Sequence, residues 1–72
     1  MDVLTEYLLK TADLFYVGEE EQGLAFLMRL SGELGKIPGI SPWINPLFDA
    51  LERKDYIYAA DIIRYEICRK TA

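Results

Sequence analysis

Hydrophobic residues recur along this chain with the three-to-four-residue spacing of an amphipathic α-helix, and no segment keeps the alternation of a β-strand. The spacing predicts helices near residues 3–17, 19–35, 46–53 and 55–69. Asp2 is placed to cap the first helix, and Gly18 to end it in a left-handed conformation. Because short loops make sequential helices antiparallel neighbours, we expect an all-α fold, a small up-and-down bundle of three to four helices that forms a single domain over residues 1–72.

The clearest break between helices is the segment 36–45, which reads KIPGISPWIN. Its Pro38-Gly39 pair is a turn signal. Ser41-Pro42 and Asn45-Pro46 each offer a capping residue followed by a proline suited to the first helical turn. The third helix therefore has two possible starts, and a short turn at 41–45 leading into a helix at Pro46 would satisfy both.

A second, weaker break falls at the charged residues Arg53, Lys54 and Asp55. Asp55 is well placed to cap a new helix, which favours a turn here. Neither Gly nor Pro is present, so a single helix over 46–70 stays open as an alternative, although it would be long for a domain of this size.

The last predicted helix is apolar on two opposite faces. One stripe contains Tyr56, Ala59, Ala60, Ile63 and Ile67, and the other contains Tyr58, Ile62 and Tyr65. A surface helix needs only one apolar stripe, so two stripes indicate burial on both sides. Because each helix of a four-helix bundle occupies a corner, we expect the second stripe to be an exposed apolar ridge that marks an interaction site.

The second and third predicted helices carry apolar stripes of their own. In the second helix the main stripe is Leu24, Leu27, Met28, Ser31 and Leu34, and in the third it is Leu47, Phe48 and Leu51. Phe26 and Leu30 lie away from the main stripe of the second helix, which leaves apolar surface there as well. The predicted interface residues are therefore Tyr58, Ile62, Tyr65, Phe26 and Leu30.

Composition favours a partner subunit and excludes several other classes of function. A chain of 72 residues with one cysteine and no histidine has no intrachain disulfide and lacks the usual nitrogen ligand of metals, so oligomerisation is the remaining way to add stability. The net charge is −4 and the basic residues are scattered, which argues against binding of nucleic acid. The longest uncharged run, 37–48, contains three prolines and is too short to span a bilayer. Without a basic N-terminal region typical of a signal peptide, we expect a cytoplasmic protein.

Catalytic signatures are weak throughout the chain. Cys68 has no histidine to activate it as a nucleophile, and no glycine-rich phosphate loop is present, so we expect neither an enzyme nor a bound cofactor or metal. Asp61 stands three residues before Arg64, the spacing of a surface ion pair. Glu66 lies between the two apolar stripes and suits an arginine or a tyrosine hydroxyl as its partner. Trp43, in the proline-rich loop, is expected to cover one end of the core.

Residues 50–67, ALERKDYIYAADIIRYEI, carry two resemblances. The charged turn followed by a small-residue helix resembles one helix–turn–helix unit of the tetratricopeptide type, but the chain shows no repeat of it and one unit cannot form a solenoid. The pattern Ala50-Leu51, Lys54-Asp55-Tyr56, Ala60-Asp61 and Tyr65-Glu66 also resembles small uncharacterised bacterial helical proteins. This resemblance covers a quarter of the chain and implies a bacterial protein without implying an activity.

Three hypotheses of function follow from these patterns. The first is a non-enzymatic helical interaction module that self-associates as a homodimer. The second is a small adaptor that accepts an amphipathic helix of another protein in a groove, by analogy with export chaperones of similar size and acidity. The third is a small-ligand carrier or enzyme that uses a pocket near Trp43 and Glu66.

Overall fold

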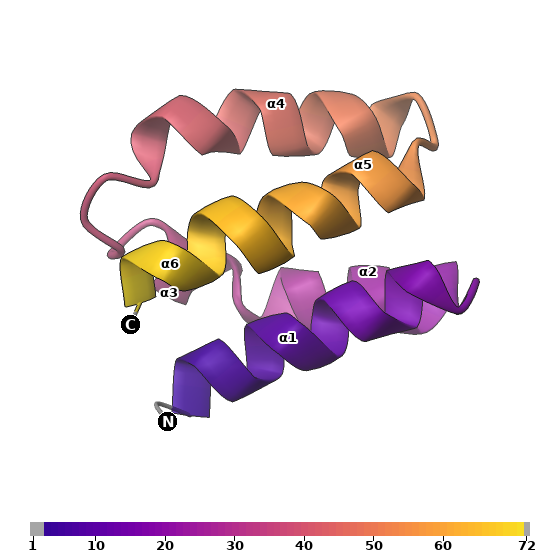
Figure 1. Ribbon diagram of the computed structural model, residues 1–72, viewed down its shortest axis with the longest axis horizontal. Coiled ribbons are helices and arrows are strands. Elements are labelled where there is room, and N and C mark those ends of the chain that lie inside the picture. Colours follow the sequence, from indigo (N-terminus) through magenta and orange to yellow (C-terminus); the bar gives the residue numbers. More distant parts are fainter. Residues whose placement is uncertain (1–2, 72) are drawn as a thin grey trace.

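The computed structural model describes residues 3–71, which form helices joined by short loops (Figure 1). The elements are α1 (Val3–Tyr16), α2 (Glu20–Arg29), α3 (Ser31–Leu34), α4 (Ser41–Glu52), α5 (Tyr56–Asp61), the π-helix η1 (Ile62–Ile67) and α6 (Cys68–Thr71). The last three follow one another without a break, and we refer to them together as the C-terminal helix. The described residues contain no strand, so the predicted all-α fold is confirmed. The proposed cap Asp2 lies outside the described residues.

Successive long helices run in alternating directions, and the C-terminal helix lies between α4 and α1 (Figure 1). It packs against α1 along its whole length and against α4 through α5 and η1. α2 packs against α1, behind which it lies in the view of Figure 1, and leads into the short α3. The first and last elements meet at one end, where the hydroxyl oxygens of Thr5 and Thr71 are 2.5 Å apart.

One contiguous core is formed by apolar side chains from every long helix. Its largest fully buried members are Phe15, Leu8, Leu47, Ile63 and Ile67. Leu34, Ile37 and Ile40 close the core at the end where α3 leads into α4, and the half-buried Trp43 packs against it there. In the part of the chain from Val3 to Thr71, no helix combines the length and the apolar character needed to cross a membrane.

The C-terminal helix has two apolar faces because it is the central helix of the bundle. It packs on both α1 and α4, which bury Ile62 of the second stripe but leave Tyr58 and Tyr65 exposed. The π-helical segment contributes to this burial, because its wider turn brings residues five apart, such as Ile62 and Ile67, onto one side of the helix. The expectation of an exposed apolar ridge on this helix is therefore wrong at Ile62, which is buried, whereas Tyr58 and Tyr65 are exposed as expected.

The ends of two helices follow local signals that were readable in the sequence. Gly18 has a φ of 88° and ends α1, with hydrogen bonds from Gly18 N to Phe15 O and from Glu19 N to Leu14 O. An equivalent pair of backbone hydrogen bonds closes the turn at 53–55, where Lys54 takes the left-handed conformation with a φ of 59°. Asp55 then caps α5 by accepting a hydrogen bond from Tyr58 N at 3.3 Å. The predicted turn at 53–55 is confirmed, and residues 46–70 are not one helix.

Two other predicted boundaries are wrong. The helix expected over 19–35 ends at Arg29, and a separate short helix follows after Leu30. The helix expected from Pro46 starts earlier, at Ser41, and continues through Pro46. Of the two possible starts, the structure has the one at Ser41-Pro42, where the proline lies in the first turn and its missing N–H costs little. Pro46 lies inside the helix, where a proline removes a backbone hydrogen bond, so the segment 41–45 is helical in spite of Pro46.

Candidate functional site

The predicted interface residues do not form one surface. Ile62 is 2% exposed and Leu30 is 8% exposed, so both belong to the core, which corrects the expectation that they lie on free apolar surface. Phe26 is half-buried against Tyr7 of α1, with 6.1 Å between the ring centroids. Tyr58 and Tyr65 are exposed, but the buried Ile62 separates them, so the expected continuous ridge is absent.

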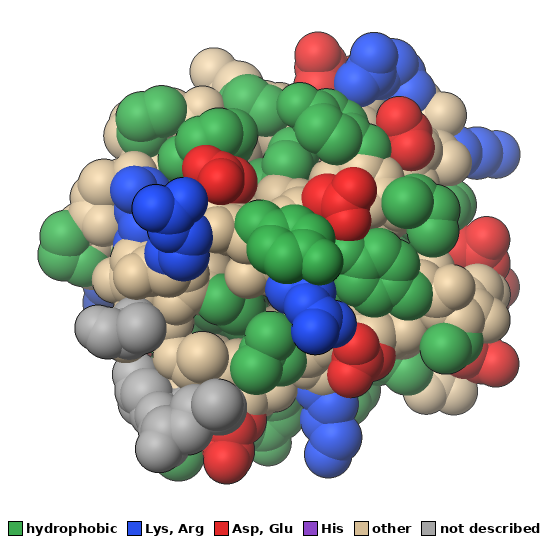
Figure 2. All heavy atoms as spheres, in the orientation of Figure 1, with side chains coloured by type: hydrophobic (Ala, Val, Ile, Leu, Met, Phe, Trp, Pro, Cys, Tyr) green, Lys and Arg blue, Asp and Glu red, His purple; other side chains and the backbone are tan. Residues whose placement is uncertain are grey.

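Figure 2 shows the face that carries α1 and the C-terminal helix. Hydrophobic side chains on this face are interrupted by acidic and basic ones, and no single wide apolar patch covers it. Arg64 contributes to this mixture, since its guanidinium carbon lies 5.9 Å from the centroid of the Tyr65 ring. This face is therefore a mixed surface, on which hydrophobic side chains lie among acidic and basic ones.

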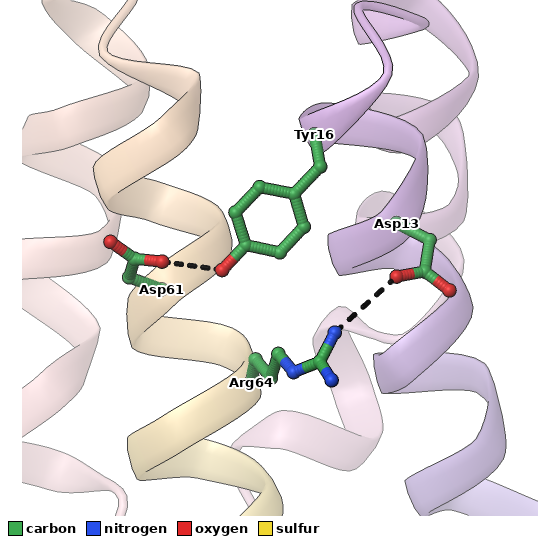
Figure 3. Close-up of polar contacts among 4 residues, drawn as sticks. All are labelled: Asp13, Tyr16, Asp61 and Arg64. Atoms are coloured by element: carbon green, nitrogen blue, oxygen red, sulfur yellow. Dashed lines mark hydrogen bonds and ion pairs between the residues drawn. The ribbon is translucent and has the colours of Figure 1, made fainter.

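A cluster of four polar residues joins α1 to the C-terminal helix at the start of the π-helical segment (Figure 3). The hydroxyl of Tyr16 donates a hydrogen bond to the carboxylate of Asp61. The guanidinium of Arg64 lies 3.7 Å from the carboxylate of Asp13. Arg64 thus pairs across the bundle with Asp13, and the ion pair expected between Asp61 and Arg64 of the same helix is wrong.

The chemistry of this cluster is that of a structural link between two helices. Burial, the hydrogen bond to Asp61 and the charge of that carboxylate together raise the pKa of Tyr16 to about 12. The phenol therefore stays protonated at neutral pH and is already engaged as a donor. The Asp13–Arg64 pair is largely exposed, and exposed pairs of this kind contribute only about 0–1 kcal/mol.

The other candidate reactive groups, Cys68 and Glu66, are either buried or paired within the chain. Cys68 is 7% exposed, and its burial raises the pKa of the thiol, which disfavours the nucleophilic thiolate. Glu66 is half-buried, and its carboxylate lies 3.7 Å from the guanidinium of Arg69 in the same helix. Between residues 3 and 71, no group of three or more acidic or cysteine side chains is placed to hold a metal ion.

Two hollows on the surface of residues 3–71 are candidate binding sites, and neither is lined by Trp43 or Glu66. The first, of about 620 Å³, lies between α1 and α2 and is wide open. Its walls are Glu6, Tyr7, Leu9, Lys10, Asp13 and Phe26. Three of these six side chains are charged, so this hollow is a hydrated depression and a poor apolar binding site.

The second hollow is an apolar groove of about 340 Å³ between α2 and α4, hereafter the α2/α4 groove. It is lined by Leu24, Leu27, Met28, Ser31, Phe48, Leu51 and Glu52. The main packing contacts of α2 are with α1 and α3, whereas those of α4 are with the C-terminal helix, so α2 and α4 pack only loosely against each other. Met28, at 75% exposure, and Phe48, at 47%, stand on opposite sides of the gap with their apolar side chains in solvent.

The helical spacing of apolar residues predicted most of the residues of this groove but not their exposure. Leu24, Leu27, Met28 and Ser31 are four of the five residues in the main apolar stripe of the second predicted helix. Phe48 and Leu51 belong to the stripe of the third predicted helix. Helical spacing marks these faces as apolar, and only the arrangement of helices reveals that the two stripes face each other without closing.

Comparisons of the chain with protein-family models, with curated proteins and with solved structures find no match. We therefore infer function from the geometry of the surface alone.

Proposed function

We propose that this chain is a non-enzymatic helical protein-interaction module that accepts the apolar face of a partner helix in the α2/α4 groove. The observation that carries the proposal is the pair of apolar side chains, Met28 and Phe48, exposed on either side of an apolar floor. The floor contains the buried Leu27 and the half-buried Leu24 and Leu51. Exposed contiguous apolar surface of this kind is typical of interaction sites.

The shape of the groove suits a helix better than it suits a small molecule. Its two walls are helical, and the lining residues span 24–31 on one side, about 10 Å at 1.5 Å per residue, and 48–52 on the other, about 6 Å. An amphipathic helix laid along such walls places side chains at positions i, i+3, i+4 and i+7 between them. Methionine is a common residue on surfaces of this type, because its flexible thioether adapts to different partner side chains.

The test uses three synthetic peptides of about 14 residues, a length close to that of α4. All three carry Leu on one helical face, and the remaining positions are Lys in the first peptide, Glu in the second and Gln in the third. Titration of the ¹⁵N-labelled protein should shift the amide signals of Leu24, Leu27 and Leu51 with at least one of the peptides. Met28→Glu should weaken binding of the uncharged Leu/Gln peptide about tenfold or more, because a charge must then enter an apolar groove.

A matched variant controls for the added charge. Val3 is 64% exposed on α1, so Val3→Glu changes net charge equally and should leave binding unaltered. The proposal fails if no peptide binds, or if Met28→Glu and Val3→Glu bind as the wild type does. Far-ultraviolet circular dichroism of both variants checks that their helices are retained.

Self-association as a homodimer is a second candidate, favoured by the exposed aromatic side chains of Tyr58 and Tyr65. Tyrosine combines apolar area with a hydroxyl and is enriched at protein interfaces. Light scattering at increasing protein concentration measures the solution mass. A homodimer that becomes a monomer in the double variant Tyr58→Ser, Tyr65→Ser supports this candidate, and a wild-type monomer at millimolar concentration removes it.

A further inference from the structure

We infer that the partner helix of the α2/α4 groove carries lysine or arginine residues beside its apolar face, and that carboxylates at one end of the groove select it. This inference rests on the proposed function, because it names the chemistry of the helix that the groove would accept. The relevant end is the one between Leu24 of α2 and Leu51 of α4.

The rim at this end carries negative charge from both helices. On α4, Glu52 follows Leu51 and itself lines the groove. On α2, Glu21 stands three residues before Leu24 and seven before Met28, and so lies on the same stripe of the helix as these two lining residues. Glu20, four residues before Leu24, lies on the adjoining part of the same face.

These carboxylates are free to meet a partner. Glu20, Glu21 and Glu52 are all exposed, and within residues 3–71 none of them forms an ion pair with a lysine or arginine of the chain. The groove has no basic residue among those that line it. A partner that places positive charge at this end gains attraction without breaking an existing pair, whereas an acidic partner is repelled.

A second copy of this chain is disfavoured as the occupant by the same charges. The chain has a net charge of −4, so two copies that bring this acidic rim together repel each other. A basic amphipathic helix of another protein satisfies both features of the groove, since its apolar face meets the floor and its flanking charges meet the rim.

The experiment compares the dissociation constants of the Leu/Lys, Leu/Gln and Leu/Glu peptides. We expect the Leu/Lys peptide to bind about tenfold more tightly than the Leu/Gln peptide, and the Leu/Glu peptide to bind most weakly, as two or three exposed ion pairs would give. The advantage of Lys over Gln should largely disappear at about 1 M salt, where the screening length is about 3 Å.

Two single variants separate a local rim effect from attraction by the overall negative charge. Glu52→Gln removes a charge from the groove, and Glu6→Gln removes one from α1, where Glu6 lines the other hollow. We expect Glu52→Gln to reduce the preference for Lys over Gln about twofold to threefold, and Glu6→Gln to leave it unchanged. Both residues are exposed, so both variants should retain the helical spectrum of the wild type.

The other possible outcomes contradict either the inference alone or the proposed function as well. If the three peptides bind the groove equally, or if the two variants act alike, the inference fails while the proposed function stands. If no peptide binds the groove, or if Glu6→Gln alone weakens binding, the inference and the proposed function both fail. If the protein without peptide dimerises through Met28 and Phe48, the occupant is a second copy and the inference is overturned.

Discussion

The packing of Gly23 under Phe15 gives a prediction in which a substitution that normally stabilises a helix should destabilise this protein. Gly23 is buried within α2, and a Cβ atom added there would lie 2.8 Å from Cε1, 2.9 Å from Cδ1 and 3.0 Å from Cζ of the Phe15 ring. The ring is 1% exposed and cannot swing into solvent. It is also stacked on Tyr56, with ring centroids 5.6 Å apart and planes 6° from parallel. The ring therefore cannot yield without disturbing the contact between α1 and the C-terminal helix.

The expected magnitude follows from two opposing terms. Replacing glycine by alanine inside a helix stabilises it by about 1 kcal/mol. Overpacking of a filled core costs about 1–3 kcal/mol. The sum for Gly23→Ala is a net destabilisation of about 1 kcal/mol, which in a domain of this size lowers the melting temperature by about 4–8 °C.

Gly32 provides the matched control. It lies in α3, and a Cβ added there would have no heavy atom within 4 Å. Gly32→Ala should therefore raise the free energy of unfolding by about 0.4–1 kcal/mol, since only the backbone term remains. Thermal and urea unfolding of the two variants, followed by far-ultraviolet circular dichroism, would give shifts of opposite sign. A Gly23→Ala variant that melts at or above Gly32→Ala would refute the packing argument. In a Phe15→Leu background, which removes the ring, the cost of Gly23→Ala should shrink.

Three further predictions concern the core and its ionisable groups. Ile62→Ala should lower the free energy of unfolding by about 2–5 kcal/mol, because Ile62 is 2% exposed. Ile57→Ala, at a side chain 53% exposed on the same helix, should lower it by no more than about 0.5 kcal/mol. Equal urea midpoints for the two variants would contradict the burial of Ile62. The pKa of Tyr16 is raised from 10.0 to about 12, so the protonated phenol stabilises the fold fully below pH 10 and this contribution is lost as the pH rises towards 12. Tyr16→Phe should remove this dependence and the absorbance step near pH 12 at 295 nm, and an unchanged titration curve would exclude the hydrogen bond to Asp61. Cys68 should react with a thiol reagent only as fast as the chain opens, because the residue is 7% exposed, and the raised pKa of its buried thiol slows the reaction further. Immediate modification in the absence of urea would show that the thiol is accessible.

Local signals in the sequence were sufficient for the fold class and for several helix ends. Helical spacing of apolar residues depends only on the 3.6-residue period, so the regions of α1, α2, α4 and the C-terminal helix could be predicted without knowledge of their neighbours. The left-handed Gly18 and the capping Asp55 could be predicted for a similar reason, since each satisfies backbone groups of its own helix end. The break at Leu30 lacked such a signal and was missed.

The tertiary structure alone decided which apolar faces are covered. Two stripes on the C-terminal helix are equally compatible with a central helix and with a corner helix that has an exposed ridge; the packing of α1 and α4 on both sides settles the choice and buries Ile62. The α2/α4 groove was equally invisible, because periodicity assigned Met28 and Phe48 to apolar stripes without indicating that their two helices stand apart. The physical reason is that periodicity depends on residues within one turn of each other, whereas burial depends on contacts between residues far apart in the chain.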